Sequence, residues 1–64
     1  MIDLQERVVT ERNELMDKIA KLANFLAADM AEPKLEDRPR WLLEQQLGVM
    51  QSYLAILDER VSLF

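Results

Sequence analysis

The amino-acid sequence predicts an all-α fold, a two-helix antiparallel hairpin that assembles into a symmetric helical oligomer. Two long segments carry apolar residues at helical spacing, and the only prolines, Pro33 and Pro39, fall between them. The chain has 64 residues and neither cysteine nor histidine, so disulfides and the usual zinc sites cannot stabilise its small core. Oligomerisation is the commonest remaining way to stabilise a fold of this size.

The first helix is predicted over residues 2–30. One apolar stripe runs along it, made of Leu4, Val8, Leu15, Ile19, Leu22 and Leu26. A second set of smaller apolar residues lies about 100° round from this stripe. Its members are Ile2, Val9, Met16, Ala20, Ala23 and Ala27. Glu11 and Arg12 interrupt the main stripe.

A connection is predicted over residues 31–38, and the second helix over 39–63. Pro39 suits the first turn of a helix, because its missing N–H has no intrahelical partner there. A residue that precedes proline is biased away from helical geometry, so Asp37 or Arg38 marks the boundary. We therefore treat residues 1–64 as a single helical-hairpin domain.

The second helix carries two apolar rows. A main seam repeats at a 4-3-4-3-4-3 spacing, typical of a coiled-coil contact, and consists of Leu43, Leu47, Met50, Leu54, Leu57, Val61 and Phe64. The second row repeats every seven residues and consists of Leu42, Val49, Ile56 and Leu63. One partner helix covers only one of them, and leaving the other in water costs several kcal/mol at ~25 cal/mol per Å². Self-association is therefore predicted. A dimeric four-helix bundle is the simplest case, and a larger assembly would cover the second row better.

Composition excludes several functions. The net charge is -4, with 12 acidic against 8 basic residues, which argues against binding long nucleic acid. No apolar run is long enough to span a membrane and the N-terminus does not resemble a signal peptide, so we expect an intracellular, soluble protein. Without histidine, cysteine or a glycine-rich phosphate loop, and with no base near its hydroxyl groups, the chain offers no catalytic, metal or cofactor site.

Arg60 stands out because it lies on the side of the second helix that carries Tyr53 and Ile56. A buried guanidinium needs a partner. One reading is an ion pair with a neighbouring helix (through Glu11, Glu14 or Asp17) or extension to the solvent at an edge. The other is a phosphate site, because the guanidinium fork suits phosphate oxygens, and copies of Arg60 could converge in an oligomer.

The remaining cations have structural readings. Lys18 and Lys21 are placed to pair with Glu14 and Asp17, each one helical turn earlier. Arg38 and Arg40 lie near a helix N-terminus, where positive charge is unfavourable, so they either reach solvent or meet an acidic partner. Trp41 is interpreted as an edge packing residue rather than a base-stacking platform.

The segments LQERVVTERNELMDKIAKLANFL and WLLEQQLGVMQSYLAILDERV together resemble a family of small phage proteins that includes the anti-CBASS cyclic-nucleotide sponges. The matching residues are Gln5, Arg7, Val8, Glu14, Leu15, Lys18, Ile19, Lys21, Leu22, Leu43, Gln46, Met50, Tyr53, Leu57, Arg60 and Val61. The most distinctive block combines Met50, Tyr53, Leu57 and Arg60. The resemblance covers nearly the whole chain.

The resemblance implies a non-enzymatic sponge in the cytoplasm of an infected host cell. Such proteins are helical hairpins that form compact homo-oligomers, typically hexamers. They hold cyclic di- and trinucleotides between protomers without cleaving them, which keeps the host's antiphage effector inactive. In this chain the ligand-binding residues would be Leu4, Arg7, Lys18, Lys21 and Arg60, with Lys18 contacting phosphate.

Leu4 departs from the family pattern, which has an aromatic residue at this position. Because base stacking on an aromatic ring is worth ~1–3 kcal/mol per base, its replacement by leucine weakens the case for cyclic dinucleotides in particular. The alternative function is a small oligomeric protein–protein interaction module without a small-molecule ligand, in which Arg60 and Lys18 form structural ion pairs.

Overall fold

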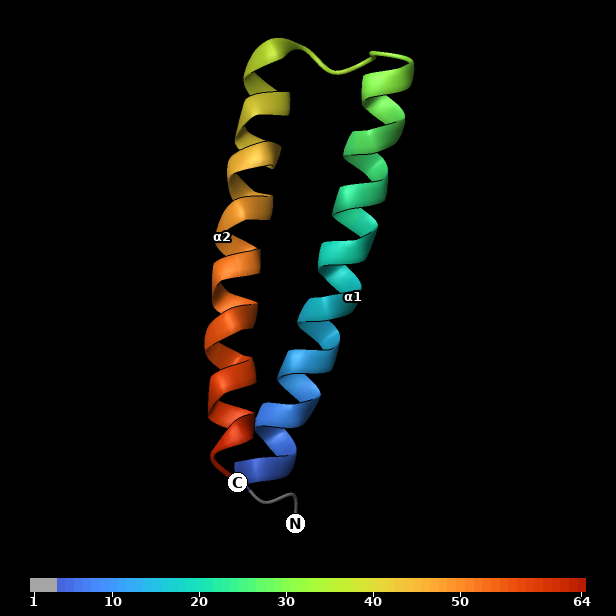
Figure 1. Ribbon diagram of the computed structural model, residues 1–64. Coiled ribbons are helices and arrows are strands. Elements are labelled where there is room, and N and C mark those ends of the chain that lie inside the picture. Colours follow the sequence, from blue (N-terminus) through green and yellow to red (C-terminus); the bar gives the residue numbers. More distant parts are fainter. Residues whose placement is uncertain (1–3) are drawn as a thin grey trace.

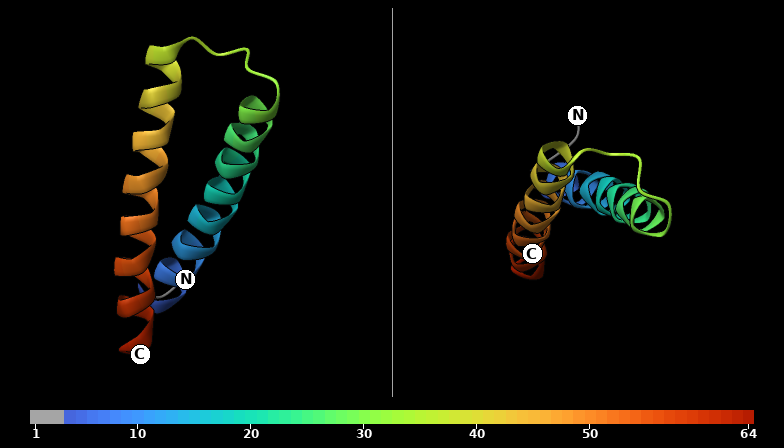
Figure 2. Two further views of the ribbon diagram at one scale, coloured as in Figure 1. Left: turned by 45° about the horizontal axis from the view of Figure 1, so that its top comes forward. Right: turned by 90° about the horizontal axis from the view of Figure 1, so that it is seen from above.

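The computed structural model of the chain, which describes residues 4–64, is a hairpin of two long antiparallel helices (Figure 1). Helix α1 spans Leu4–Ala31 and helix α2 spans Asp37–Ser62. The hairpin is elongated, with extents of 44 × 17 × 16 Å. The helices lie closest near the two chain ends and spread apart toward the connection, as Figure 1 and the left view of Figure 2 show. The predicted all-α hairpin is confirmed.

The core follows the predicted seam. Val8 and Leu15 of α1 pack with Leu57 of α2, and all three are buried. Four partly buried residues complete the cluster, namely Ile19, Met50, Leu54 and Val61. Leu26 is buried nearer the connection, where Leu43 and Leu47 are half-buried. The apolar spacing in the sequence therefore identified the faces through which the helices meet.

The helix boundaries near the connection lie close to the prediction. Helix α1 continues past the predicted residue 30 to Ala31, and α2 begins at Asp37, one of the two residues expected to mark the boundary and two residues before Pro39. The first four N–H groups of a helix have no intrahelical acceptor, so a proline at the third position loses no hydrogen bond. The Arg40 N–H donates to the Glu36 carbonyl at 3.1 Å and opens the ladder just after the proline. The predicted start of the first helix, at Ile2, lies outside the described residues.

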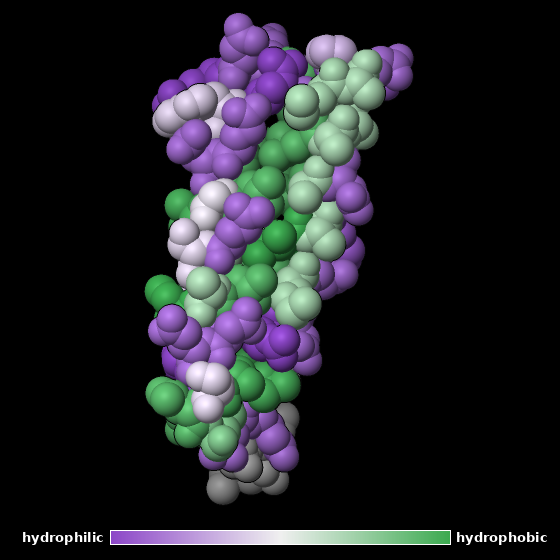
Figure 3. Space-filling model, viewed as in Figure 1, coloured by the Kyte–Doolittle hydropathy of each residue, from purple (hydrophilic) through white to green (hydrophobic). Residues whose placement is uncertain are grey.

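The apolar faces that the hairpin leaves uncovered are extensive. The four residues of the second row are between 48% and 85% exposed. Met16 of the small apolar set on α1 is also exposed, as is Met30 further along that helix. At the open end, Leu4 and Phe64 are exposed although the sequence placed them on the main stripes, because no other element covers them there. Figure 3 shows a pale green column along α1 and stronger green between the helices.

None of the helices in residues 4–64 has the length and apolar character needed to cross a lipid bilayer.

Leu57 is fully buried, so Leu57→Ala should lower the free energy of unfolding by about 2–5 kcal/mol through lost contacts and the cavity left behind. Urea denaturation followed by circular dichroism, at matched protein concentrations, measures the change. Leu4→Ala is the control, because Leu4 is exposed. Equal losses in the two variants would contradict the position of the core.

Candidate ligand-binding surface

The eight basic residues of the chain divide into two groups. Arg12, Lys21 and Arg40 form ion pairs, and Arg38 stacks on an aromatic ring. The others are Arg7, Lys18, Lys34 and Arg60. The contacts of each group determine which basic side chains remain available to bind an anionic ligand.

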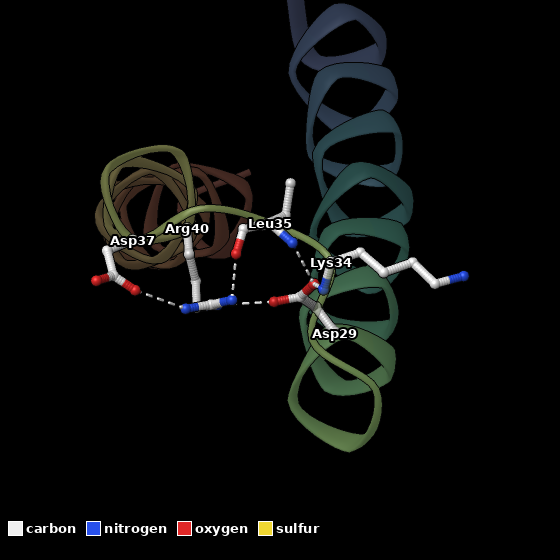
Figure 4. A network of polar contacts seen from close by, with 5 residues as sticks. All are labelled: Asp29, Lys34, Leu35, Asp37 and Arg40. Atoms are coloured by element: carbon white, nitrogen blue, oxygen red, sulfur yellow. Dashed lines mark hydrogen bonds and ion pairs between the residues drawn. The ribbon is translucent and has the colours of Figure 1, made fainter.

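Arg40 and Asp29 hold the connection against the helices (Figure 4). Asp29, in the last turns of α1, is buried, and its carboxylate accepts the Arg40 Nε–H at 2.7 Å. Its other oxygen accepts the backbone N–H groups of Lys34 and Leu35 at 2.9 and 3.0 Å. Arg40 also donates to the Leu35 carbonyl and to Asp37. One carboxylate thus fixes both the turn and the start of α2.

These hydrogen bonds stabilise the charged form of Asp29. The Lys34 N–H, the Arg40 guanidinium and the Leu35 N–H together lower the pKa of Asp29 from 3.8 to about 2, although burial acts in the opposite direction. Reciprocally, the Asp29 carboxylate raises the pKa of Arg40. Sequence reasoning left open whether Arg40 meets an acidic partner and missed Asp29 altogether. Asp29 follows Leu26 by three positions and so continues the core stripe toward the connection, which was the available signal.

Arg12 and Asp58 form the second pair that joins the helices. The Arg12 Nε–H donates to Asp58 at 2.6 Å, and both side chains are partly exposed. Arg12 interrupts the apolar stripe of α1 because it faces this carboxylate at the margin of the core. Such partly exposed pairs contribute little to stability, but this one shows which flanks of α1 and α2 lie side by side.

Two local contacts engage further cations. Lys21 Nζ lies 2.9 Å from Asp17 one turn earlier, as the sequence predicted. The predicted companion pair of Lys18 with Glu14 does not form within the part of the chain that the structure describes. The Arg38 guanidinium lies 5.0 Å from the centre of the half-exposed Trp41 ring, a cation–π contact at the edge of the hairpin.

Arg7, Lys18 and Arg60 are exposed and form no ion pair with any carboxylate in residues 4–64. The sequence left open whether Arg60 pairs with a neighbouring helix, extends to solvent at an edge or binds phosphate; in the hairpin it is exposed, because nothing covers that side of α2. None of the pairs considered for Arg60, with Glu11, Glu14 or Asp17, forms within residues 4–64. Its position in the last turn of α2 is favourable for a cation, since the helix dipole is negative there.

Three cations without an ion pair (Arg7, Lys18 and Arg60) share one side of the hairpin with Lys21, which pairs with Asp17. At 100° per residue, Arg7, Lys18 and Lys21 fall within about 60° of one another on α1, on the opposite side of the core stripe from Arg12. The same geometry places Arg60 and the second row on the opposite side of the α2 seam from Asp58. The Arg12–Asp58 contact joins the flank of α1 that carries Arg12 to the flank of α2 that carries Asp58. The opposite flanks, which carry the cations of α1 and the second row of α2, therefore lie together on the other side of the hairpin. We call Arg7, Lys18, Lys21 and Arg60 the cationic face.

The cationic face has two separate regions. Arg7 and Arg60 lie near the open end of the hairpin, together with Leu4, which is 71% exposed. Lys18 lies eleven residues beyond Arg7, about 16 Å further along the helix axis. One hairpin therefore does not bring all five predicted residues (Leu4, Arg7, Lys18, Lys21 and Arg60) into a single compact pocket.

A hollow of about 260 Å³ lies at the other end of the molecule, near the connection. It is lined by Phe25, Ala28, Asp29, Glu32, Lys34 and Leu35. None of the five predicted site residues contributes to it. Residues 4–64 also contain no group of three acidic side chains arranged to hold a metal ion.

The fold and this surface define a class of protein, a short helical hairpin that exposes apolar and cationic side chains on one side. The chain belongs to the Sequestin family, whose sequence profile matches residues 2–63. This agrees with the phage sponge family that its motifs resemble. The family name denotes sequestration, a binding role rather than catalysis. No curated protein and no solved structure is significantly similar to the chain.

The Asp29 network predicts a specific acid sensitivity. Because the pKa of Asp29 is lower in the folded chain, its stabilising contribution is complete above about pH 4 and is lost as the pH falls from 3.8 toward 2. Asp29→Asn should reduce stability at neutral pH and flatten the decline over that interval. Urea denaturation at a series of pH values measures both effects.

Asp17→Asn is the matched control, because it removes an acid from the exposed pair with Lys21. This variant should keep the acid-dependent decline of the wild-type chain. An unchanged decline in Asp29→Asn would show that other groups cause it.

Proposed function

We propose that this member of the Sequestin family is a phage sponge for cyclic oligonucleotide second messengers. It binds cyclic di- or trinucleotides without cleaving them and blocks CBASS-type antiphage signalling in the cytoplasm of the infected host cell. The observation that carries the proposal is the match of the family's profile to residues 2–63, nearly the whole chain. The motif around Tyr53 and Arg60 supports it.

The cationic face supplies the chemistry that such a ligand needs. A cyclic oligonucleotide is a compact polyanion with one phosphodiester charge per nucleotide. Arg60 and Arg7 offer planar guanidinium groups that donate two hydrogen bonds to a phosphate, and Lys18 offers a point charge. Arg7, Lys18 and Arg60 are exposed and unpaired within residues 4–64, so binding an anion breaks no ion pair of the hairpin. Lys21 already pairs with Asp17, so a phosphate bound to Lys21 would compete with that carboxylate.

The ligand site is proposed to lie between protomers. The open-end residues and Lys18 are too far apart along one hairpin to surround a small ligand, so an enclosed site needs a second copy of the chain. A homo-oligomer, proposed here as a hexamer built from dimers, would meet this need. It would also cover the apolar second row. Exposed Leu4, where the family pattern has an aromatic residue, would give an apolar platform with weaker stacking and favours ligands held chiefly through phosphate.

A second candidate function is an oligomeric helical module that binds another protein and no small molecule. The exposed second row favours it, because a row of large apolar side chains is a common docking surface for a partner helix. The two functions differ in what Arg60 does.

Arg60→Ala separates the two functions. Loss of charge-assisted hydrogen bonds worth about 1.5–3 kcal/mol should weaken cyclic nucleotide binding about 10- to 100-fold, with the fold and assembly retained. Calorimetric titration measures the affinity and analytical ultracentrifugation the assembly. Arg38→Ala is the control, because it removes the same charge from the other end of α2 and should bind like the wild-type chain.

Unchanged affinity in Arg60→Ala would contradict the assignment of Arg60 to the ligand site. Dissociation of the oligomer by this variant would indicate that Arg60 has a structural role, as the interaction-module function requires.

A further inference from the structure

Helix α2 carries a second coiled-coil seam in addition to the one that packs on α1. Gln46, Tyr53 and Arg60 fall between members of the second row, so that the combined positions again follow a 4-3-4-3-4-3 spacing. Such spacing keeps one face of a helix turned toward a partner over its whole length. All seven residues are exposed in the hairpin, and none of them is acidic. The face is therefore built as a helix-packing surface but has no partner within residues 4–64.

The order of residues along this seam is nearly the same in both directions. Leu42 and Leu63 lie equally far from the midpoint between Ser52 and Tyr53, and so do Val49 and Ile56. Two copies of α2 that run antiparallel about this midpoint would place Leu42 opposite Leu63, and Val49 opposite Ile56. A two-fold symmetric interface requires this kind of self-complementarity, whereas a contact with an unrelated helix does not.

We infer that a second copy of this chain packs along the second row of α2, antiparallel, about a two-fold axis between Ser52 and Tyr53. The second row meets its own symmetric copy and loses its contact with water. Charge favours the same arrangement. A parallel pair would set the two Arg60 side chains beside each other, whereas the antiparallel pair separates them by fifteen residues, about 22 Å along the axis.

The polar positions also match in the antiparallel register. Arg60 falls opposite Gln45 and next to Gln46 of the other copy, so no like charge lies beside its guanidinium. Arg60 then sits at each end of the interface, at the edge of the apolar contact and on the side that carries the cations of α1.

This interface is independent of any ligand, because it rests on exposed apolar residues and their order. It goes beyond the proposed sponge function, which requires protomers to meet but does not say how. Ligand titration and cross-linking therefore test different claims, and either can fail without the other.

The absence of cysteine from the chain allows a direct test by single cysteine substitutions and mild oxidation. Tyr53→Cys places the thiols of two copies beside the two-fold axis and should give a covalent dimer. Val49→Cys should not cross-link to itself, because its two copies are offset by seven residues, about 10 Å along the axis. That offset exceeds the Cα separation of about 7 Å that a disulfide bridges. A mixture of Val49→Cys and Ile56→Cys should form the mixed dimer.

Efficient cross-linking of Val49→Cys with itself would overturn the inference in favour of a parallel pair. Failure of both Tyr53→Cys and the mixed pair to cross-link would overturn it in favour of another surface. Circular dichroism of each variant ensures that the hairpin is folded, as expected for substitutions at exposed positions.

A second measurement tests the surface without oxidation. Val49→Glu buries an unpaired carboxylate against Ile56 of the other copy and should raise the dissociation constant of the dimer about a hundredfold or more. Ala27→Glu adds the same charge to the small apolar set of α1 and should leave sedimentation unchanged. An intact assembly in Val49→Glu, or dissociation of Ala27→Glu alone, would place the contact elsewhere.

Discussion

A two-helix hairpin can bury only one apolar face of each helix, and this constraint governs the whole molecule. Helix α2 has two such faces. The main seam packs on α1 through Leu57 and its neighbours, and the second row remains exposed. Because the helices lie closest near the chain ends, the best-packed part of the core lies there. The hairpin fold therefore leaves the second row uncovered. This exposed row is the reason for expecting the chain to form an oligomer.

The same geometry divides the basic side chains into those that join the two helices and those that remain available to a ligand. Arg40 and Arg12 bridge the two helices through buried Asp29 and partly exposed Asp58. Arg7, Lys18 and Arg60 have no such role among the described residues. In a chain with a net charge of -4, these three cations remain unpaired on one side of the hairpin. Their availability supports the proposal that a compact anion binds between copies of the chain.

The sequence predicted much of the fold because the relevant signal is periodic. Spacing alone located the seam of α2, and Pro33 and Pro39 located the connection. The network around Asp29 could not be predicted, because its donors come from the connection and from α2, and their approach depends on how the helices meet. The environment of Arg60 was left open for a different reason. Its apolar neighbours suggested burial, but spacing cannot tell a face packed within the hairpin from one that awaits another copy. The five candidate site residues rest on the family resemblance, which identifies residue types and leaves their ligand to experiment.

The most direct test of the account is a calorimetric titration of the purified chain with a cyclic dinucleotide and, separately, a cyclic trinucleotide. The nucleotide should then be recovered and analysed by chromatography. Tight binding of at least one of the two and recovery of the intact ring are expected. A folded, assembled protein that binds neither ligand, or that returns a cleaved nucleotide, would contradict it.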